Sequence, residues 1–252
     1  MKVSRDMLYN GNCSDVMKQL PDNYIDCIIT DVPYGVNYKN TFYNDDKDYV
    51  LNEAPKWFEQ YYRIIKNDSY LYMFVGVKTL HNWIQLGIDA GFTYKNVIAT
   101  RSFNNGSPTP KNNFGFQFQP IILFSKGKGK AFNDVEFIPT SVEWLNDKRN
   151  KNPKPYTYSY PNWIKTDWAF ATAKRANKSM HPNEKNIDLI EFFVKVSTNE
   201  GDVVLDSFMG CGSTGIACVN SNRSFVGIEL DETYFKLAKE RISNERTSKE
   251  WF

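Results

Sequence analysis

The stretch VVLDSFMGCGST, residues 203–214, decides the fold of this chain. Its apolar start predicts a buried strand, and the turn at Gly210 and Gly212 lets the backbone approach a ligand closely. Ser213 or Thr214 is expected to cap the following helix, whose amino terminus favours a negative group. A strand that passes through a glycine turn into a helix predicts an α/β fold with a ligand at the strand end.

The next unit adds an acidic residue to this pattern. Residues 224–228 are predicted to form a second strand that ends at Glu229, which follows Gly210 by 19 residues. An acidic side chain about 20 residues after the glycine turn holds a ribose diol in nucleotide-binding folds. A simple capping carboxylate is the alternative role for Glu229. With the glycine turn upstream, the spacing favours nucleoside binding.

A second strand end, in the stretch IITDVPYG at residues 28–35, offers different chemistry. It presents the Asp31 carboxylate, the Val32 carbonyl and the Tyr34 ring within four residues, while Pro33 stiffens the loop. This set suits a flat, amino-bearing ring such as a nucleobase. We expect the base to stack on Tyr34 and to donate its amino hydrogens to Asp31 and to the carbonyl of Val32. The side chain of Val32 is expected to matter least.

Length and composition limit the other possibilities. At 252 residues the chain fits one large domain or a core with one insertion. It shows no apolar run of the roughly 18 residues that a membrane helix needs, and no signal-peptide pattern. The four cysteines form no Cys-x-x-Cys pair, so we expect free thiols, no bound metal and a cytoplasmic location.

Hydrophobic periodicity predicts further elements on both sides of the two motifs. The additional strands are expected at residues 6–10, 25–30, 70–75, 97–100 and 120–124. The helices are expected to follow a Ser14 cap, to span 54–65, 79–90 and 186–197, and to follow an Asp231 cap. The polar segment 35–50 is expected to be either a mobile flap over Asp31 or an ordinary surface loop.

Between residues 127 and 180 the periodicity fades and the chain becomes basic. Residues 146–178 carry eight basic and two acidic side chains, although the net charge of the whole chain is only +2. A local basic field on a nearly neutral protein indicates a polyanionic partner. A solvated surface segment is the alternative.

These motifs resemble those of DNA adenine-N6 methyltransferases of the β order, in which the catalytic motif precedes the cofactor motif. The family's Asp-Pro-Pro-Tyr is matched by Asp31-Val32-Pro33-Tyr34. Its cofactor loop, Asp-Pro-Phe-x-Gly-x-Gly-Thr, is matched at residues 206–213, with Ser207 in place of Pro and Ser213 in place of Thr. Two flanking motifs agree as well: Gly-Asp-Cys appears as Gly11-Asn12-Cys13, and His-Pro-x-x-Lys-Pro appears at residues 181–186 without its final Pro.

The resemblance implies a Rossmann-like class I methyltransferase fold, a seven-stranded, mostly parallel sheet with helices on both faces, plus a target-recognition insertion. It assigns residues 1–126 and 181–252 to the catalytic domain and residues 127–180 to the insertion, with residues 102–115 a second recognition candidate. The implied cofactor is S-adenosylmethionine. Its expected binding residues are Asn12, Cys13, Asp31, His181, Lys185, Asp206, Phe208, Gly210, Gly212, Ser213, Thr214 and Glu229.

The implied reaction is site-specific methyl transfer to the N6 amino group of a flipped-out adenine in double-stranded DNA. The catalytic residues are then Asp31, Val32, Pro33 and Tyr34. DNA contacts are expected from basic side chains of the insertion, namely Lys148, Arg149, Lys151, Lys154, Lys174, Arg175 and Lys178. A homodimer and a restriction endonuclease are further candidate partners.

Three alternatives stay open. A cytosine-N4 methyltransferase uses the same geometry, but its tetrapeptide usually begins with Ser, so Asp31 favours adenine. A DNA-binding regulator with a relic cofactor fold is disfavoured because Asp31, Tyr34, Asp206 and Glu229 are intact. A nicotinamide-dependent oxidoreductase has no use for residues 31–34, and the third glycine of its fingerprint is not cleanly met.

Overall fold

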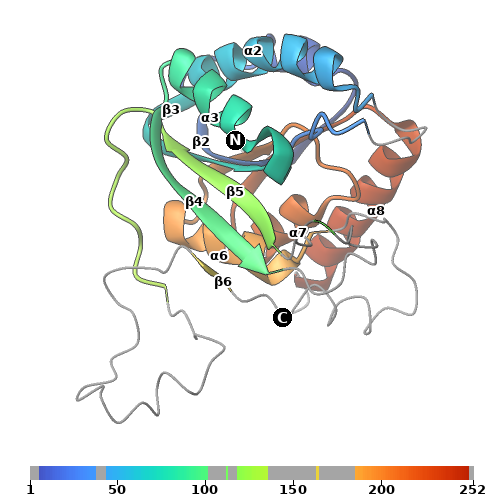
Figure 1. Ribbon diagram of the computed structural model, residues 1–252. Helices are drawn as coiled ribbons and strands as arrows, with labels where there is room; N and C mark the ends of the chain where they lie inside the picture. The colour runs from blue at the N-terminus through green and yellow to red at the C-terminus, as the bar shows by residue number, and fades with distance from the viewer. Residues whose placement is uncertain are drawn as a thin grey trace.

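The computed structural model describes residues 6–37, 44–101, 112, 118–135, 163–164 and 185–249. They form one mixed sheet with helices packed on both faces (Figure 1). The strands are β1 (Asp6–Asn10), β2 (Ile25–Asp31), β3 (Ile65–Phe74), β4 (Thr93–Arg101), β5 (Phe118–Ser125), β6 (Trp163–Ile164), β7 (Val203–Asp206) and β8 (Ser224–Glu229). The helices are α1 (Cys13–Met17), α2 (Lys47–Ile64), the 3-10 turn η1 (Val77–Thr79), α3 (Leu80–Asp89), α6 (Ile187–Ser197), α7 (Ser213–Asn220) and α8 (Glu232–Lys249).

The sheet has the order β1-β8-β7-β2-β3-β5-β4-β6. The first five of these strands run parallel, whereas β5 is antiparallel to both of its neighbours, β3 and β4. The two-residue strand β6 extends the edge parallel to β4. The predicted seven-stranded, mostly parallel sheet is therefore confirmed, and β6 adds a short eighth strand within the described chain.

The strand order places a crevice between β7 and β2. From β7 the chain winds through α7 to β8 on one side, and from β2 it winds through α2 to β3 on the other side. The two strands themselves are direct neighbours, with Cys27 opposite Val204 and Ile28 opposite Leu205. Ligands of open α/β sheets bind outside the carboxyl ends of the strands at such a switch point. Asp31 and Asp206 end these two strands, so the fold brings both carboxylates to one edge.

The alternation of side chains along the central strands divides the core between the two faces of the sheet. On β3, Leu71 and Met73 belong to the cluster that α1, α2 and α3 cover, while Tyr72 and Phe74 belong to the cluster under α6, α7 and α8. Figure 1 shows α2 and α3 on one side of the sheet and α6, α7 and α8 on the other. Helices on both faces are what a parallel sheet requires.

One predicted boundary was wrong in a way that affects the site. The helix expected at residue 54 begins at Lys47, where Asp46 caps it by accepting a 2.9 Å hydrogen bond from the Tyr49 N–H. Pro55 imitates a helix start, because proline favours the first helical position, but it lies inside α2. Of the segment 35–50, predicted to be a flap or a surface loop, residues 47–50 are thus helix, and residues 38–43 lie outside the described residues.

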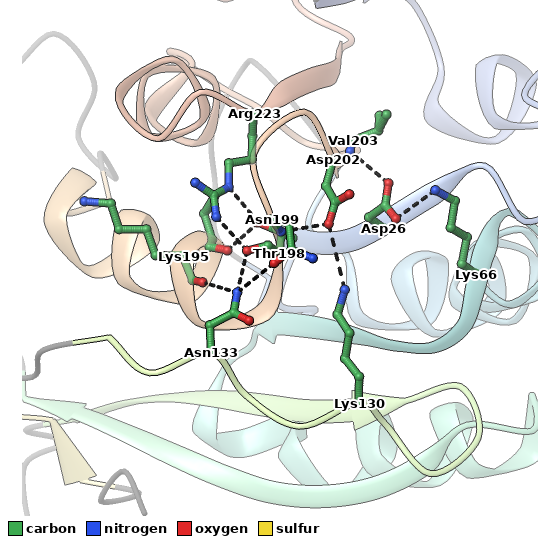
Figure 2. A network of polar contacts seen from close by, with 11 residues as sticks. Asp26, Lys66, Lys130, Asn133, Lys195, Thr198, Asn199, Asp202, Val203 and Arg223 are labelled. Atoms are coloured by element: carbon green, nitrogen blue, oxygen red, sulfur yellow. Dashed lines mark hydrogen bonds and ion pairs between the residues drawn. The ribbon is translucent and has the colours of Figure 1, made fainter. Parts of the chain in front are cut away.

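A polar network connects the beginning of the predicted insertion to the end of α6 and to the residues just before β7 (Figure 2). Asn133 donates through Nδ2 to the carbonyls of Lys195 and Thr198 over 2.9 and 2.7 Å, at the end of α6. Lys130 lies 3.8 Å from Asp202, just before β7. Residues 127–135 therefore contact the catalytic part of the chain. The domain limits at 127 and 180 stay a prediction.

No helix in the described ranges is long and apolar enough to cross a membrane. No group of three or more His, Cys, Asp or Glu side chains among the same residues is arranged to hold a metal ion.

Candidate active site

Asp31 stands at the carboxyl end of β2, and both of its oxygens are held. Lys185 Nζ lies 2.8 Å from Asp31 Oδ2, and the Tyr34 hydroxyl donates to Oδ1 over 2.7 Å. The Asp31 side chain is still 24% exposed, so it remains accessible from the cavity described below. The carboxylate is therefore oriented before a ligand arrives.

Val32, which follows Asp31, is 1% exposed and belongs to the core cluster beneath α2. The expectation that its side chain matters least for the reaction stays a prediction, while in the fold the buried valine contributes packing. Its backbone carbonyl remains the group with the predicted chemical role.

Tyr34 is held by side chains from distant parts of the sequence. Gln119 of β5 donates through Nε2 to the Tyr34 hydroxyl, which also lies 3.2 Å from Lys185 Nζ. The Thr79 hydroxyl of η1 donates to the Tyr34 carbonyl over 2.7 Å. Gly76 packs so closely that a Cβ at this position would lie 3.1 Å from Tyr34 Cβ. Sequence analysis missed Gln119, Thr79 and Gly76, since only the fold brings them to the motif.

Asp206 stands at the carboxyl end of β7 and is satisfied by its own loop. The Thr214 hydroxyl donates to Oδ2 over 2.6 Å, and the Phe208 N–H donates to Oδ1 over 3.1 Å. Burial raises the pKa of Asp206 to about 7; these hydrogen bonds oppose the rise and the charge on Asp31 adds to it. A buried carboxylate of this kind is suited to a cationic ligand group, which would offset its desolvation.

The glycine turn enters α7 without the predicted cap. Gly212 is the N-cap residue, in the left-handed region with φ 85°, and no side chain caps the helix. The expectation that Ser213 or Thr214 caps was wrong, because the Thr214 hydroxyl donates to Asp206 instead. A Cβ at Gly212 would also approach Ala238 Cβ to 3.0 Å, so both the conformation and the close packing require glycine.

Glu229 joins the end of β8 to the glycine turn. Its Oε2 accepts from the Gly210 N–H over 2.9 Å, and its Oε1 accepts from the Asp231 N–H over 2.8 Å. Burial raises the pKa of Glu229, while the hydrogen bonds from Asp231 and Gly210 lower it. The alternative capping role is therefore present, and ribose binding by Glu229 stays a prediction. Asp231 caps α8 as expected, accepting from the N–H groups of Thr233 and Tyr234 over 2.9 and 3.0 Å.

The Gly11–Cys13 motif follows β1 next to Glu229. Gly11 donates through its N–H to the Glu229 carbonyl over 2.9 Å. Asn12, rather than the expected Ser14, caps α1 by accepting a 2.9 Å bond from the Ser14 N–H. Cys13 is 7% exposed, and burial raises the pKa of its thiol to about 12. The thiol is therefore protonated at neutral pH, and the motif lies at the β1 end of the site.

Residues at the carboxyl ends of β1, β8, β7 and β2 line one cavity. The predicted site residues in its wall are Asn12, Cys13, Asp31, Val32, Pro33, Tyr34, Lys185, Asp206, Phe208, Gly210, Ser213, Thr214 and Glu229. Gly212 lies in the same turn but not in the wall. His181 and the seven predicted DNA-binding side chains lie outside the described residues, so their roles stay predictions.

The charges of the cavity fit S-adenosylmethionine. Among the described residues its wall carries four carboxylates, Asp31, Glu53, Asp206 and Glu229, against the single cation Lys185. An acidic wall suits a ligand that bears a sulfonium and an ammonium group. Leu230, 59% exposed beside Glu229, adds an apolar surface for an aromatic ring. Sequence analysis did not single out Glu53, because α2 was predicted to begin after it.

A parallel sheet with a single reversed strand, and an acidic cavity at its switch point, define the class: an enzyme with the class I methyltransferase fold. The particular family follows from the match of residues 25–240 to the family model described as DNA methylase, which covers N6 and N4 amino-methylating enzymes. The chain belongs to this family and is a DNA methyltransferase.

The chain is similar to individual relatives over most of their length. The chain is 31% identical over 243 residues to the type II methyltransferase M.HpaI of Haemophilus parainfluenzae, covering 93% of this chain and 73% of the relative. It is 26% identical to the DNA adenine methyltransferase YhdJ of Escherichia coli, covering 93% and 82%. Among solved structures it is similar to M1.HpyAVI in complex with SAM, at 25% identity and a TM-score of 0.63, covering 94% and 99%.

Proposed function

We propose that this DNA methyltransferase acts at specific sites and transfers the methyl group of S-adenosylmethionine to the N6 amino group of adenine. The observation that carries the proposal is the pair of acceptors at the end of β2. Asp31 and Val32 lie in the wall of the same cavity as Asp206 and Glu229. A two-hydrogen amino group fits two acceptors, and the acidic strand ends fit the cationic donor.

The two acceptors compensate for the weak nucleophilicity of the adenine amino group, whose lone pair is delocalised into the ring. Asp31 and the Val32 carbonyl accept the two N6 hydrogens and draw the nitrogen toward a tetrahedral geometry, which frees the lone pair. The cofactor supplies an activated methyl group on its sulfonium. As the N–C bond formed and the bond from the methyl group to sulfur broke, the neutral thioether S-adenosylhomocysteine would leave, and N6 would pass one proton along its hydrogen bond to Asp31. Asp31 thus acts as an acceptor and orienter more than as a strong base.

The incoming base has to compete with a protein donor. Oδ1 of Asp31 accepts from the Tyr34 hydroxyl in this structure. We infer that the amino group of the base replaces the Tyr34 hydroxyl, which keeps Gln119 and Lys185 as partners. Tyr34 then presents its ring as a stacking surface for the flipped base, a surface that any base can use. The base must leave the duplex first, at a cost of a few kcal/mol.

The cofactor residues divide by position along the sheet edge. Glu229 is assigned to the ribose, Asn12 and Cys13 to the adenine end, and Asp206 to the ammonium of the methionine moiety. Lys185, the wall's single described cation, is assigned with His181 to the methionine end. Phe208, Gly210, Gly212, Ser213 and Thr214 shape the loop around the cofactor.

The remaining parts of the proposal concern partners and location. Residues 127–180, with their basic side chains, are proposed to contact DNA and to set the salt dependence of binding. A restriction endonuclease is proposed as a partner because one relative is named as a type II methyltransferase. A homodimer is proposed from the family resemblance alone. A cytoplasmic location is supported by four buried cysteines that form no disulfide. Sedimentation velocity with and without duplex DNA tests the homodimer.

Nucleoside mass spectrometry tests the main proposal. Purified protein is incubated with S-adenosylmethionine and unmethylated duplex DNA, and the DNA is digested to nucleosides. N6-methyldeoxyadenosine is the expected product. N4-methyldeoxycytidine would instead establish the alternative, which the family as a whole includes and the same pair of acceptors permits.

A further inference from the structure

Three buried hydroxyl groups meet beneath the site, between β2, β7 and α2. The Tyr61 hydroxyl lies 2.5 Å from Ser207 Oγ, and Ser207 Oγ lies 3.1 Å from Thr30 Oγ1. Tyr61, Thr30 and Ser207 are 0%, 1% and 2% exposed. Buried hydroxyl groups are costly unless they are hydrogen-bonded, so the three satisfy one another where water is excluded.

The network lies between the two functional carboxylates. Thr30 directly precedes Asp31 on β2, and Ser207 directly follows Asp206 on β7. The Thr30 hydroxyl also interacts with the Asp206 carboxyl and helps to lower the pKa of Asp206 against the rise caused by burial. The network therefore links the strand end that carries the acceptor to the strand end that carries the cofactor loop.

Tyr61 differs from its two partners because it does not line the cavity. Thr30 and Ser207 are part of the cavity wall, whereas Tyr61 reaches the network from the interior face of α2. Its effect on a ligand must therefore pass through Ser207 and Thr30. Ser207 stands where the family motif has proline, which would stiffen the loop by fixing its φ angle. Here the hydrogen bonds of the Ser207 hydroxyl restrain the loop instead.

We propose that Tyr61 is a positioning residue: through Ser207 and Thr30 it fixes the Asp206 loop relative to Asp31. The inference rests on the proposed function in that the cavity binds the methyl donor, but it does not depend on which base is methylated. The hydroxyl of Tyr61, rather than its ring, carries the effect.

The variant Tyr61→Phe isolates that hydroxyl. The matched control is Tyr72→Phe, which removes another buried tyrosine–serine contact, the 2.7 Å pair of Tyr72 with Ser197 Oγ, away from the cavity wall. Calorimetry with S-adenosylhomocysteine and S-adenosylmethionine gives cofactor affinity, and thermal unfolding without ligand reports stability. We expect both variants to lose stability, but only Tyr61→Phe to weaken cofactor binding, by about tenfold, the equivalent of one hydrogen bond of about 1.4 kcal/mol.

A rescue variant separates positioning from general destabilisation. Ser207→Pro in the Tyr61→Phe background restores a stiff loop without the hydroxyl, and we expect it to recover most of the lost affinity. Cofactor affinity of Tyr61→Phe equal to that of the unmodified protein, or an equal loss in Tyr72→Phe, would overturn the proposal. An unmodified protein that binds no S-adenosylmethionine would instead overturn the proposed function.

Discussion

The loop after β7 and the loop after β2 meet in one cavity, yet they are held in different ways. Asp206 is 5% exposed and takes its hydrogen bonds from Phe208 and Thr214 of its own loop. Asp31 is more accessible and is held by Tyr34 and by Lys185, which precedes α6. The hydrogen bonds to Asp206 thus form within its own loop, whereas those to Asp31 come from groups that a substrate can displace. Binding of the methyl donor and activation of the target base are therefore expected to be separable by mutation.

The largest effect is expected from Asp31→Asn. An amide keeps the size of the side chain but removes the charge that draws the amino group, so the transfer rate should fall by about 1,000-fold or more. Cofactor affinity should change by less than about fivefold, because Asp206 and Glu229 remain. Asp26→Asn is the matched control on the same strand, paired with Lys66 at the other end of β2. Single-turnover assays and calorimetry provide the two readouts; undiminished transfer would remove Asp31 from the mechanism.

Glu229→Gln is expected to affect the cofactor loop rather than the acceptor loop. The amide keeps the shape but replaces one acceptor by a donor that faces the N–H of Gly210 or Asp231, so the glycine turn loses its support. Losing charged hydrogen bonds of this kind should weaken cofactor binding by about 10- to 30-fold. Glu232→Gln, in the exposed first turn of α8, is the control. Unchanged cofactor affinity in Glu229→Gln would show that the ribose is held elsewhere.

Gln119→Leu tests whether distant support of the acceptor loop matters. Without the amide, Tyr34 loses the contact from β5 and spends less time in position to stack on the base. We expect the single-turnover rate to fall by about tenfold, with cofactor affinity unaltered. Gln85→Leu, on the exposed face of α3, controls for the loss of an amide. A rate equal to that of the unmodified enzyme would mean that Lys185 and Thr79 hold Tyr34 without help.

The smallest expected effect is the pH dependence of cofactor binding. The pKa of Asp206 is raised to about 7, so this carboxyl is ionised above that pH and neutral below it. The ionised form attracts the cationic cofactor, and affinity should therefore fall by roughly fivefold as the pH is lowered from 8 to 6. Calorimetry across this range checks the slope. Asp206→Asn should flatten it, and an equal slope in that variant would assign the titration to another group.

The partly local character of the cofactor loop explains why it was predictable from sequence. Asp206, Gly210 and Thr214 lie within nine residues of one another, and their contacts form inside one strand–turn–helix unit. The spacing from Gly210 to Glu229 likewise corresponds to one helix and the strand that follows it. The mostly parallel sheet was implied by the family resemblance, and in the structure β2 and β7 pair, so Asp31 and Asp206 end at the same edge.

What could not be predicted depends on non-local contacts. Gln119 is separated from Tyr34 by 85 residues, and Tyr61 is separated from Ser207 by 146. No periodicity or motif marks such pairs, since their partners are chosen by strand register and helix packing. Two of the cap predictions were wrong because of competition for hydrogen bonds. The Thr214 hydroxyl donates to Asp206 instead of capping α7, and Asn12 rather than Ser14 caps α1. In each case the tertiary or neighbouring partner outweighed the local preference.

The separation of the two loops is tested most directly by comparing Asp31→Ala with Asp206→Asn in one experiment. Cofactor affinity and the transfer rate at saturating cofactor and DNA are measured for both variants. Asp31→Ala is predicted to bind S-adenosylmethionine nearly as well as the unmodified enzyme and to transfer no methyl group. Asp206→Asn is predicted to bind it at least tenfold more weakly but to transfer methyl within about tenfold of the normal rate once saturated. Equal loss of affinity and of saturated rate in both variants would contradict the division of roles.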